Sequence, residues 1–216
     1  QYRETDFNFV SRLMEQEGIY YYFEHENGKH TMVLVDDVSS HQPFPDYNAI
    51  TYRTRLDQQV EGEYIYDWNH GIEAQPGNYV LNDFNFEKPK ASLKTSSNIN
   101  RDHTNSDFEI YDYPGEYSEF ADGEALAKRR IEELQTDYHD VQAAAKSRGI
   151  AVGCIFSLED HPRDDQNEDY LVTSARYDVQ NASYESGGSE ESAFRCDFTA
   201  KKADQPYRSK RVTPKP

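Results

Sequence analysis

The feature that most constrains the fold is a change of period after Gly149, where apolar residues begin to alternate with polar ones. An extended strand points successive side chains to opposite faces, so this spacing places one apolar set on a single face. The pattern recurs in three segments: Val152, Cys154, Phe156 and Leu158; Leu171, Thr173, Ala175, Tyr177 and Val179; Phe194, Cys196 and Phe198. It predicts an antiparallel sheet or barrel over the last third of the chain.

The first half of the chain combines a helical pattern with a hairpin. Residues 5–17 keep apolar spacings of three and four, Thr5 or Asp6 can cap the start, and Gly18 can close the end. Residues 19–26 and 30–36 are rich in aromatic and β-branched types. The Asn27-Gly28 pair between them favours a type I′ turn.

The longest helical pattern runs over residues 117–147, where apolar residues recur at helical spacing and opposite charges stand four apart. Together with the strand patterns it predicts a mixed α+β fold.

Charge and hydropathy exclude two classes of partner. The chain carries 40 acidic and 23 basic side chains, a net charge of −17, which repels the phosphate backbone of nucleic acids. No apolar run approaches the ~20 residues of a membrane-spanning helix, so stable membrane insertion is not expected. No signal-peptide pattern opens the chain, which begins at Gln1, and we interpret it as a piece of a longer protein.

The last seventeen residues differ from the rest in charge. Residues 200–216 hold six basic side chains against Asp204, a net charge of +5, and three prolines that favour extended conformations. We predict a segment outside the core, and its composition alone favours a solvated basic tail.

The two cysteines, Cys154 and Cys196, are too few for a disulfide framework. Each alternates with apolar neighbours, so we predict two buried free thiols.

Catalytic and ligand-binding motifs are missing from the sequence. It has no His-Glu-x-x-His, G-x-S-x-G, P-loop, G-x-G-x-x-G or Cys-x-x-Cys sequence. We therefore predict no catalytic, cofactor-binding or metal-binding residues, no cofactor and no enzyme activity.

Two further arrangements of side chains could bind a metal or act as a catalytic pair. His25 and His30 face one another across the predicted hairpin and could bind a metal with Asp36, Asp37 or His41, but two solvated histidines are the better interpretation. Adjacent carboxylates could form a glycosidase pair, yet forty acidic residues produce such pairs by chance: Asp36 with Asp37, Glu132 with Glu133, and Asp164 with Asp165.

The aromatic strand Tyr20-Tyr21-Tyr22-Phe23 presents rings on both faces. A platform for sugars or bases would leave one face open, whereas packing in a core or against a subunit would cover both. We favour packing and keep the ligand platform as the alternative.

Several motifs, in order along nearly the whole chain, resemble the VgrG proteins, the spike proteins of type VI secretion systems, and the wider group of phage baseplate hubs. The resemblance rests on these segments: QYRETDFNFVSRLMEQEGIYYYFEHENGKHTMVLVDD, YDWNHG, NDFNFEKPKASL, ALAKRRIEELQ and VGCIFSLEDHPRDDQNEDYLVTS. It implies an antiparallel, barrel-like hub domain with an outer α+β domain interleaved between its parts.

We expect residues 1–58 and 102–146 to form the outer domain, and residues 59–101 and 147–199 to form the tube-forming barrel. The boundaries follow the polar stretch 90–107 and the change of period after Gly149. Residues 200–216 would be a partly ordered connector from the hub to a neck and needle, with their cations along the acidic surface of a neighbouring subunit.

The resemblance implies a structural role: the hub of a spike that docks on a hexameric tube protein and carries the needle and effectors. Its implied partners are two further copies in a homotrimer, the tube, a spike tip protein, effectors and the baseplate. Such a protein is assembled in the bacterial cytoplasm and then secreted into target cells. A contractile phage tail hub is one alternative. A carbohydrate-active enzyme or binding module is an alternative of another class.

Overall fold

The computed structural model describes residues 1–54, 61–180 and 193–216. Its helices are α1 (Asp6–Glu17) and α2 (Phe120–Gln135). Its strands are β1 (Tyr20–Glu26), β2 (Lys29–Val35), β3 (Gln42–Pro43), β4 (Ala49–Thr51), β5 (Ile65–Ile72), β6 (Asn78–Leu81), β7 (Thr95–Asn98), β8 (Glu109–Asp112), β9 (His139–Ala145), β10 (Cys154–Glu159), β11 (Asp169–Gln180) and β12 (Ala193–Lys202). The predicted α+β class is confirmed.

Local signals explain α1 and the hairpin. The Thr5 side chain caps α1 by accepting a hydrogen bond from the Asn8 amide, and Gly18 ends the helix in the left-handed conformation (φ 72°). Strands β1 and β2 then pair from Tyr20↔Val35 to Glu26↔Lys29. Gly28 takes a positive φ but Asn27 does not, so the predicted type I′ turn is wrong.

The largest sheet has the strand order β3-β10-β11-β12-β9-β5, with β4 also pairing with β10. Strands β9 to β12 and β5 pair antiparallel, while β3 and β4 run parallel to β10. An isolated bridge between Tyr52 and Ile65 brings the two ends of this sheet together at one point. Within the described residues, the sheet therefore curls back on itself without a continuous ladder around a barrel.

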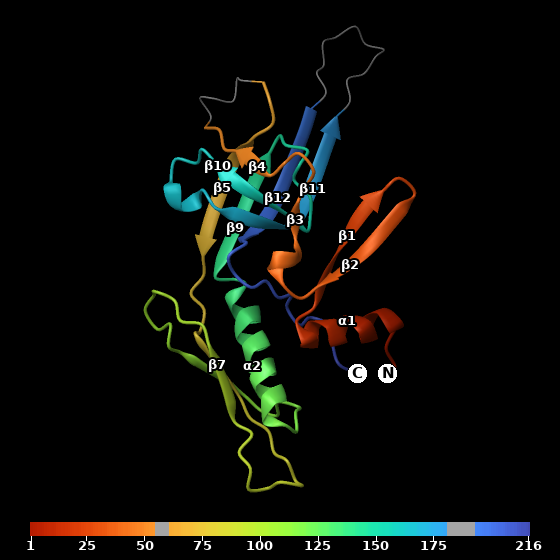
Figure 1. Cartoon of the computed structure of the whole chain (residues 1–216), viewed down its shortest axis with the longest axis vertical. Helices are drawn as coiled ribbons and strands as arrows, with labels where there is room; N and C mark the ends of the chain where they lie inside the picture. Colours follow the sequence, from red (N-terminus) through yellow and green to blue (C-terminus); the bar gives the residue numbers. More distant parts are fainter. Residues whose placement is uncertain (55–60, 181–192) are drawn as a thin grey trace.

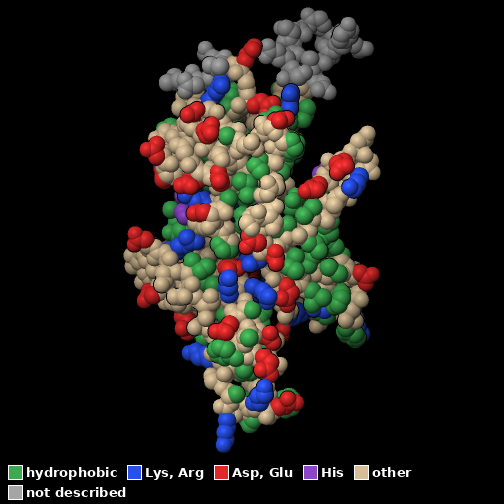
Figure 2. Space-filling model, in the orientation of Figure 1, with side chains coloured by type: hydrophobic (Ala, Val, Ile, Leu, Met, Phe, Trp, Pro, Cys, Tyr) green, Lys and Arg blue, Asp and Glu red, His purple; other side chains and the backbone are tan. Residues whose placement is uncertain are grey.

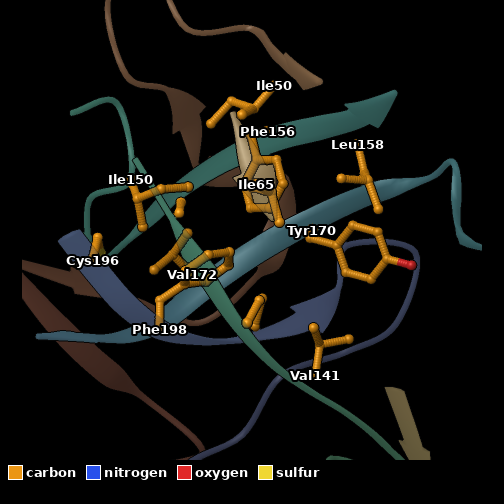
Figure 3. Close-up of a cluster of buried hydrophobic side chains, with 13 residues drawn as sticks. Ile50, Ile65, Val141, Ile150, Phe156, Leu158, Tyr170, Val172, Cys196 and Phe198 are labelled. Atoms are coloured by element: carbon orange, nitrogen blue, oxygen red, sulfur yellow. The ribbon is translucent and has the colours of Figure 1, made fainter. Parts of the chain in front are cut away.

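One face of this curled sheet holds the main core (Figure 3). Phe156, Tyr170 and Phe198 pack there with aliphatic side chains from the neighbouring strands: Ile50, Ile65, Val141, Ile150, Leu158 and Val172. Trp68 adds an edge-to-face contact with Tyr170, at 4.8 Å between ring centroids.

A β-bulge in β11 changes which of its residues share a face, compared with the alternation predicted from the sequence. The pairing of β11 with β12 shifts register between Val172 and Ser174. Tyr170 and Val172 therefore join the core before the bulge, and Ala175 packs against it afterwards. Because one extra residue reverses the faces, the prediction that Leu171 and Thr173 share a face with Ala175 is wrong.

Both cysteines are free thiols, as predicted, but only Cys196 is fully buried. Cys154 stands at the start of β10 and is partly exposed. Burial also raises the pKa of the Cys196 thiol to about 12, so very little thiolate forms at neutral pH.

Thiol titration tests this difference. We expect two reactive thiols in the unfolded, unreduced protein, and in the native protein we expect Cys154 to react first. Equal native rates would contradict the burial of Cys196, and Cys196→Ser identifies the slow group.

The second unit is a three-stranded sheet, β7-β6-β8, covered by α2 (Figure 1). Its core includes Tyr79, Tyr117, Leu126 and Ile131. The helix predicted over 117–147 is too long, because residues 139–145 form β9 in the large sheet instead. Val141, Ala143 and Ala145 point into the main core, so tertiary packing overrides the helical propensity of this alanine-rich stretch.

The strand pairing differs from the expected domain division at three places. Strand β9, expected in the outer domain, pairs between β12 and β5 in the large sheet. Strands β6 and β7, expected in the barrel, pair with β8 beneath α2. In addition, β3 and β4 extend the large sheet from within residues 1–58.

The C-terminal segment begins inside the sheet. Residues 200–202 belong to β12, and Ala200 is buried in the main core, so the predicted boundary of the connector at residue 200 is wrong. Residues 203–216, here called the strap, have no helix or strand. Both chain termini lie near α1 (Figure 1). Neither of the described helices has the length and apolar character needed to cross a bilayer.

Candidate docking site

The strap is fastened to the rest of the chain by Arg208. Its guanidinium donates to Glu132 of α2 (Nε–Oε2 2.8 Å) and to the backbone carbonyls of Gly18 (2.8 Å) and Asp36 (2.5 Å). Its backbone amide donates to the Thr136 hydroxyl (3.0 Å). One side chain therefore joins the end of α1, the end of β2 and helix α2.

Further polar contacts follow Arg208 along the strap. The Glu15 carboxylate accepts hydrogen bonds from the amides of Val212 and Thr213 and from the Thr213 hydroxyl. Lys210, Arg211 and Lys215 form ion pairs with Asp137, Glu133 and Glu116, in that order. The strap cations, predicted to lie on a neighbouring subunit, thus pair with acids of their own chain.

A buried polar chain lies beside the strap. The His41 Nδ1 donates to the Gly153 carbonyl (2.7 Å), so the neutral ring can accept at Nε2 from the Tyr20 hydroxyl (2.8 Å). Tyr207 packs edge-on against Tyr20, at 4.8 Å between centroids. Burial raises the pKa of Tyr20 and lowers the pKa of His41, so both groups stay uncharged at neutral pH.

A cavity of about 350 Å³ opens between α1, β1, the strap and the large sheet, and we call it the socket. Its apolar lining includes Phe7, Met14, Ile19, Tyr21, Val152 and Val212. Polar side chains also line it, and the Ser11 hydroxyl among them is buried without a hydrogen-bond partner within the described structure. Binding pockets in proteins typically combine an apolar lining with a few polar groups and hold about 300–1,000 Å³.

Helix α1 and the hairpin, together the arm, expose many apolar side chains (Figure 2). They are Phe7, Val10 and Leu13 of the helix, and Phe23, Met32 and Leu34 of the hairpin. Among the described strands, β1 and β2 pair only with each other. An isolated two-stranded sheet with open edges and an apolar surface is typical of an element that a partner covers.

The aromatic strand therefore has two different environments. Tyr20 is buried and bonded to His41, and the Tyr22 ring lies against His41 at 5.2 Å between centroids. On the other face, Phe23 is 46% exposed. The inner face packs as the sequence predicted, while Phe23, Met32 and Leu34 of the outer face are exposed.

The histidines and aspartates that could bind a metal do not lie together. His25 and His30 do face each other, with 2.6 Å between their Nδ1 atoms, on the exposed hairpin. His41, however, is committed to Tyr20 and Gly153. Within residues 1–54, 61–180 and 193–216, no three metal-binding side chains gather at one place.

The adjacent carboxylates are used in structural contacts. Glu132 pairs with Arg208, and Glu133 pairs with both Arg130 and Arg211. Hydrogen bonding from Arg163 lowers the pKa of Asp165 to about 2. A glycosidase acid needs a raised pKa in a cleft, and these paired carboxylates are unsuited to that role.

Sequence analysis missed a second histidine pair, because its members lie 69 residues apart. The Nε2 of His70 and the Nδ1 of His139 are 3.0 Å apart, and the rings stack. Burial, aided by nearby positive charges, lowers the pKa of both rings, and that of His139 falls to about 4. Only the cross-strand pairing of β5 with β9 brings them together.

This pair predicts that folding stability falls in acid. The unfolded rings bind protons near pH 6.5, whereas folded His139 resists protonation until about pH 4. The unfolded chain therefore binds more protons in between, and stability decreases as pH falls from 6.5. Urea midpoints between pH 7.5 and 5 should show this slope, and His139→Gln should reduce it. A His139→Gln variant that keeps the full slope would contradict this assignment.

Comparison with solved structures finds proteins of similar fold. The E. coli c3393 structure, described as a type VI secretion component similar to bacteriophage T4 tail proteins, matches with a TM-score of 0.60. The match covers 100% of this chain and 42% of that chain, at 16% identity. A prophage tail protein of Shewanella oneidensis matches with a TM-score of 0.59 over 93% of this chain and 56% of its own, at 8% identity. At these identities the matches establish the fold alone.

Sequence relatives then establish the family. Residues 1–183 match the phage tail baseplate hub (GPD) family, and the chain belongs to it. The type VI secretion system spike proteins VgrG1b and VgrG1a of Pseudomonas aeruginosa are 46% and 43% identical over 100% of the chain. The chain spans 29% and 34% of their lengths, about a third. The resemblance predicted from the sequence motifs is confirmed.

Proposed function

We propose that this chain is a structural segment of the hub of a type VI secretion spike. The observation that carries the proposal is the 46% identity to the VgrG1b spike protein along the entire chain. The exposed arm supports it, because a hub must present surfaces to neighbouring proteins.

In this proposal the full-length protein is a homotrimer that docks on a hexameric tube, meets the baseplate, and carries a tip protein and effectors. It is assembled in the bacterial cytoplasm and then delivered into a target cell. The curled sheet would contribute to the tube-like ring, and the three-stranded sheet with α2 would form the outer part. Mass measurement of the full-length protein by light scattering tests the trimer.

We further propose that this segment has no enzymatic activity of its own. A Vibrio cholerae protein named actin cross-linking toxin VgrG1 is 29% identical over 92% of the chain, but the chain spans only 18% of that protein. The named activity of such a relative would then reside elsewhere in its length.

A chimera tests the proposed role. The matching region of VgrG1b is replaced by this chain, and secretion of the tube protein is measured in cells lacking the native spike. Secretion near the native level supports a shared hub function. A chimera that is produced at normal levels but secretes nothing would contradict it.

A contractile phage tail hub is the second candidate, favoured by the family's description as a phage tail baseplate hub. The same chimera separates the two, because a phage hub would not be expected to restore secretion.

A further inference from the structure

We propose that the socket under the arm receives an aromatic loop from a second copy of this chain. The loop is residues 82–90, here called the plug, and its inserted side chain is Phe86. This inference rests on the proposed trimeric hub and names the surfaces that join its subunits.

The socket has an unmet hydrogen-bonding group. Ser11 is 8% exposed, and its hydroxyl has no partner within the described structure. A buried, unsatisfied hydroxyl costs about 1–3 kcal/mol, so a ligand that supplies a carbonyl or hydroxyl here gains from bonding it. Since Phe7, Met14 and Val152 also line the socket, an aromatic side chain with an adjacent backbone carbonyl fits there.

The socket also opens onto an uncovered surface. Phe7 and Val152 line it and are 62% and 39% exposed. A small free ligand would leave these side chains and the outer face of the hairpin in water. A protein partner would fill the cavity and cover the arm in one contact, which favours a macromolecular occupant.

The plug displays apolar side chains on a rigid loop. Phe86 is 80% exposed, the highest value among the large apolar side chains of the described residues, and Phe84 lies two residues before it. Between them, the buried Asn85 accepts hydrogen bonds from the amides of Glu87 and Lys88 and donates to the Ser118 carbonyl. A loop held in this way loses little conformational entropy on binding.

Charges at the two surfaces are complementary. Residues 82–94, the plug and the segment after it, carry Lys88, Lys90 and Lys94 against Asp83 and Glu87, a net charge of +1. The arm carries five acidic side chains against Arg12 and Lys29, a net charge of −3. Opposite net charges favour a plug-to-arm contact over an arm-to-arm contact between two acidic surfaces.

Plug and socket are different surfaces, so the contact is head-to-tail. Such a contact repeats from copy to copy and closes into a ring when the rotation permits, whereas a self-complementary contact yields a dimer. A threefold ring is the closed arrangement that the proposed trimer requires.

Mixing two variants provides the test. Phe86→Asp destroys the plug and keeps the socket, while Val152→Arg obstructs the socket and keeps the plug. We expect the unmodified chain to gain mass toward three copies as concentration rises in light scattering. Each variant alone should associate at least about tenfold more weakly. An equimolar mixture should form a one-to-one complex, because each pair retains one intact contact.

Control variants keep the test decisive. Phe108→Asp changes another exposed phenylalanine and should not alter association. Ser11→Ala should weaken association between copies and raise the thermal unfolding midpoint of the free chain. General misfolding would lower both the association and the midpoint, so this combination excludes it. A chain that stays monomeric at every concentration, or variants that never form the mixed complex, would overturn the proposal. If the VgrG1b chimera still secretes the tube protein in that case, the proposed hub function is retained and only the plug-to-socket contact is refuted.

Discussion

Replacing Arg208 with alanine is expected to lower the free energy of unfolding by about 3 kcal/mol, the scale for breaking a buried ion pair from one side. The Arg208 side chain is 15% exposed and the Glu132 side chain only 6%. The substitution leaves Glu132 buried, and the one charged partner that remains to it among the described residues is the ammonium of Lys128, at 3.9 Å. It also removes the donor that two backbone carbonyls share, those of Gly18 and Asp36.

Urea denaturation measures the loss, and Lys210→Ala is the matched control. Lys210 lies on the same strap and pairs with Asp137, but its side chain is 63% exposed. Exposed pairs contribute at most about 1 kcal/mol, so the control should change stability little. Trypsin should cut the strap faster in the Arg208 variant than in the control. Equal stability losses in both variants would contradict the special role of Arg208.

Local chemistry made α1 and the hairpin predictable from the sequence. Thr5 and Gly18 mark the two ends of the helix, and the Asn27-Gly28 pair marks the turn between β1 and β2. Each signal lies within a few residues of the element it defines, so no knowledge of distant contacts was needed.

The corrections to the large sheet arise from distant contacts. Strand β9 carries an alanine-rich sequence suited to a helix, yet it pairs with β12 and β5 on either side. The bulge near Thr173 leaves no mark in the alternating pattern, because the residues on both sides of it are apolar or small. In each case the sheet decides the outcome, and the sheet is assembled from segments far apart in the chain.

The candidate site was the least predictable part. The socket is lined by α1, β1, the sheet and the strap. It forms because Arg208 and Tyr207 of the strap contact residues of the arm region that lie some 190 positions earlier in the chain. Composition did indicate the strap as a distinct basic segment, but it could not show that the matching acids belong to the same chain.

Substituting Gly153 with alanine should lower the free energy of unfolding by about 3 kcal/mol, and Gly28→Ala separates its two causes. Both glycines take positive φ angles, 82° and 75°, which cost a residue with a Cβ about 1–2 kcal/mol. At Gly28 an added Cβ meets no atom within 4 Å, so only this backbone cost applies. At Gly153 the Cβ would lie 2.4 Å from the Tyr22 ring, and such overpacking adds about 1–3 kcal/mol.

The backbone at Gly153 cannot shift freely to relieve that clash. Its amide donates to the Val172 carbonyl and its carbonyl accepts from His41, so movement would break one bond or the other. We therefore expect the Tyr22 ring to move and the floor of the socket to change with it. Denaturation curves of the two variants, recorded under one set of conditions, give the difference. Equal losses of unfolding free energy at Gly153 and Gly28 would mean that the Tyr22 ring moves aside at no energetic cost. The inner face of the hairpin would then be loosely packed.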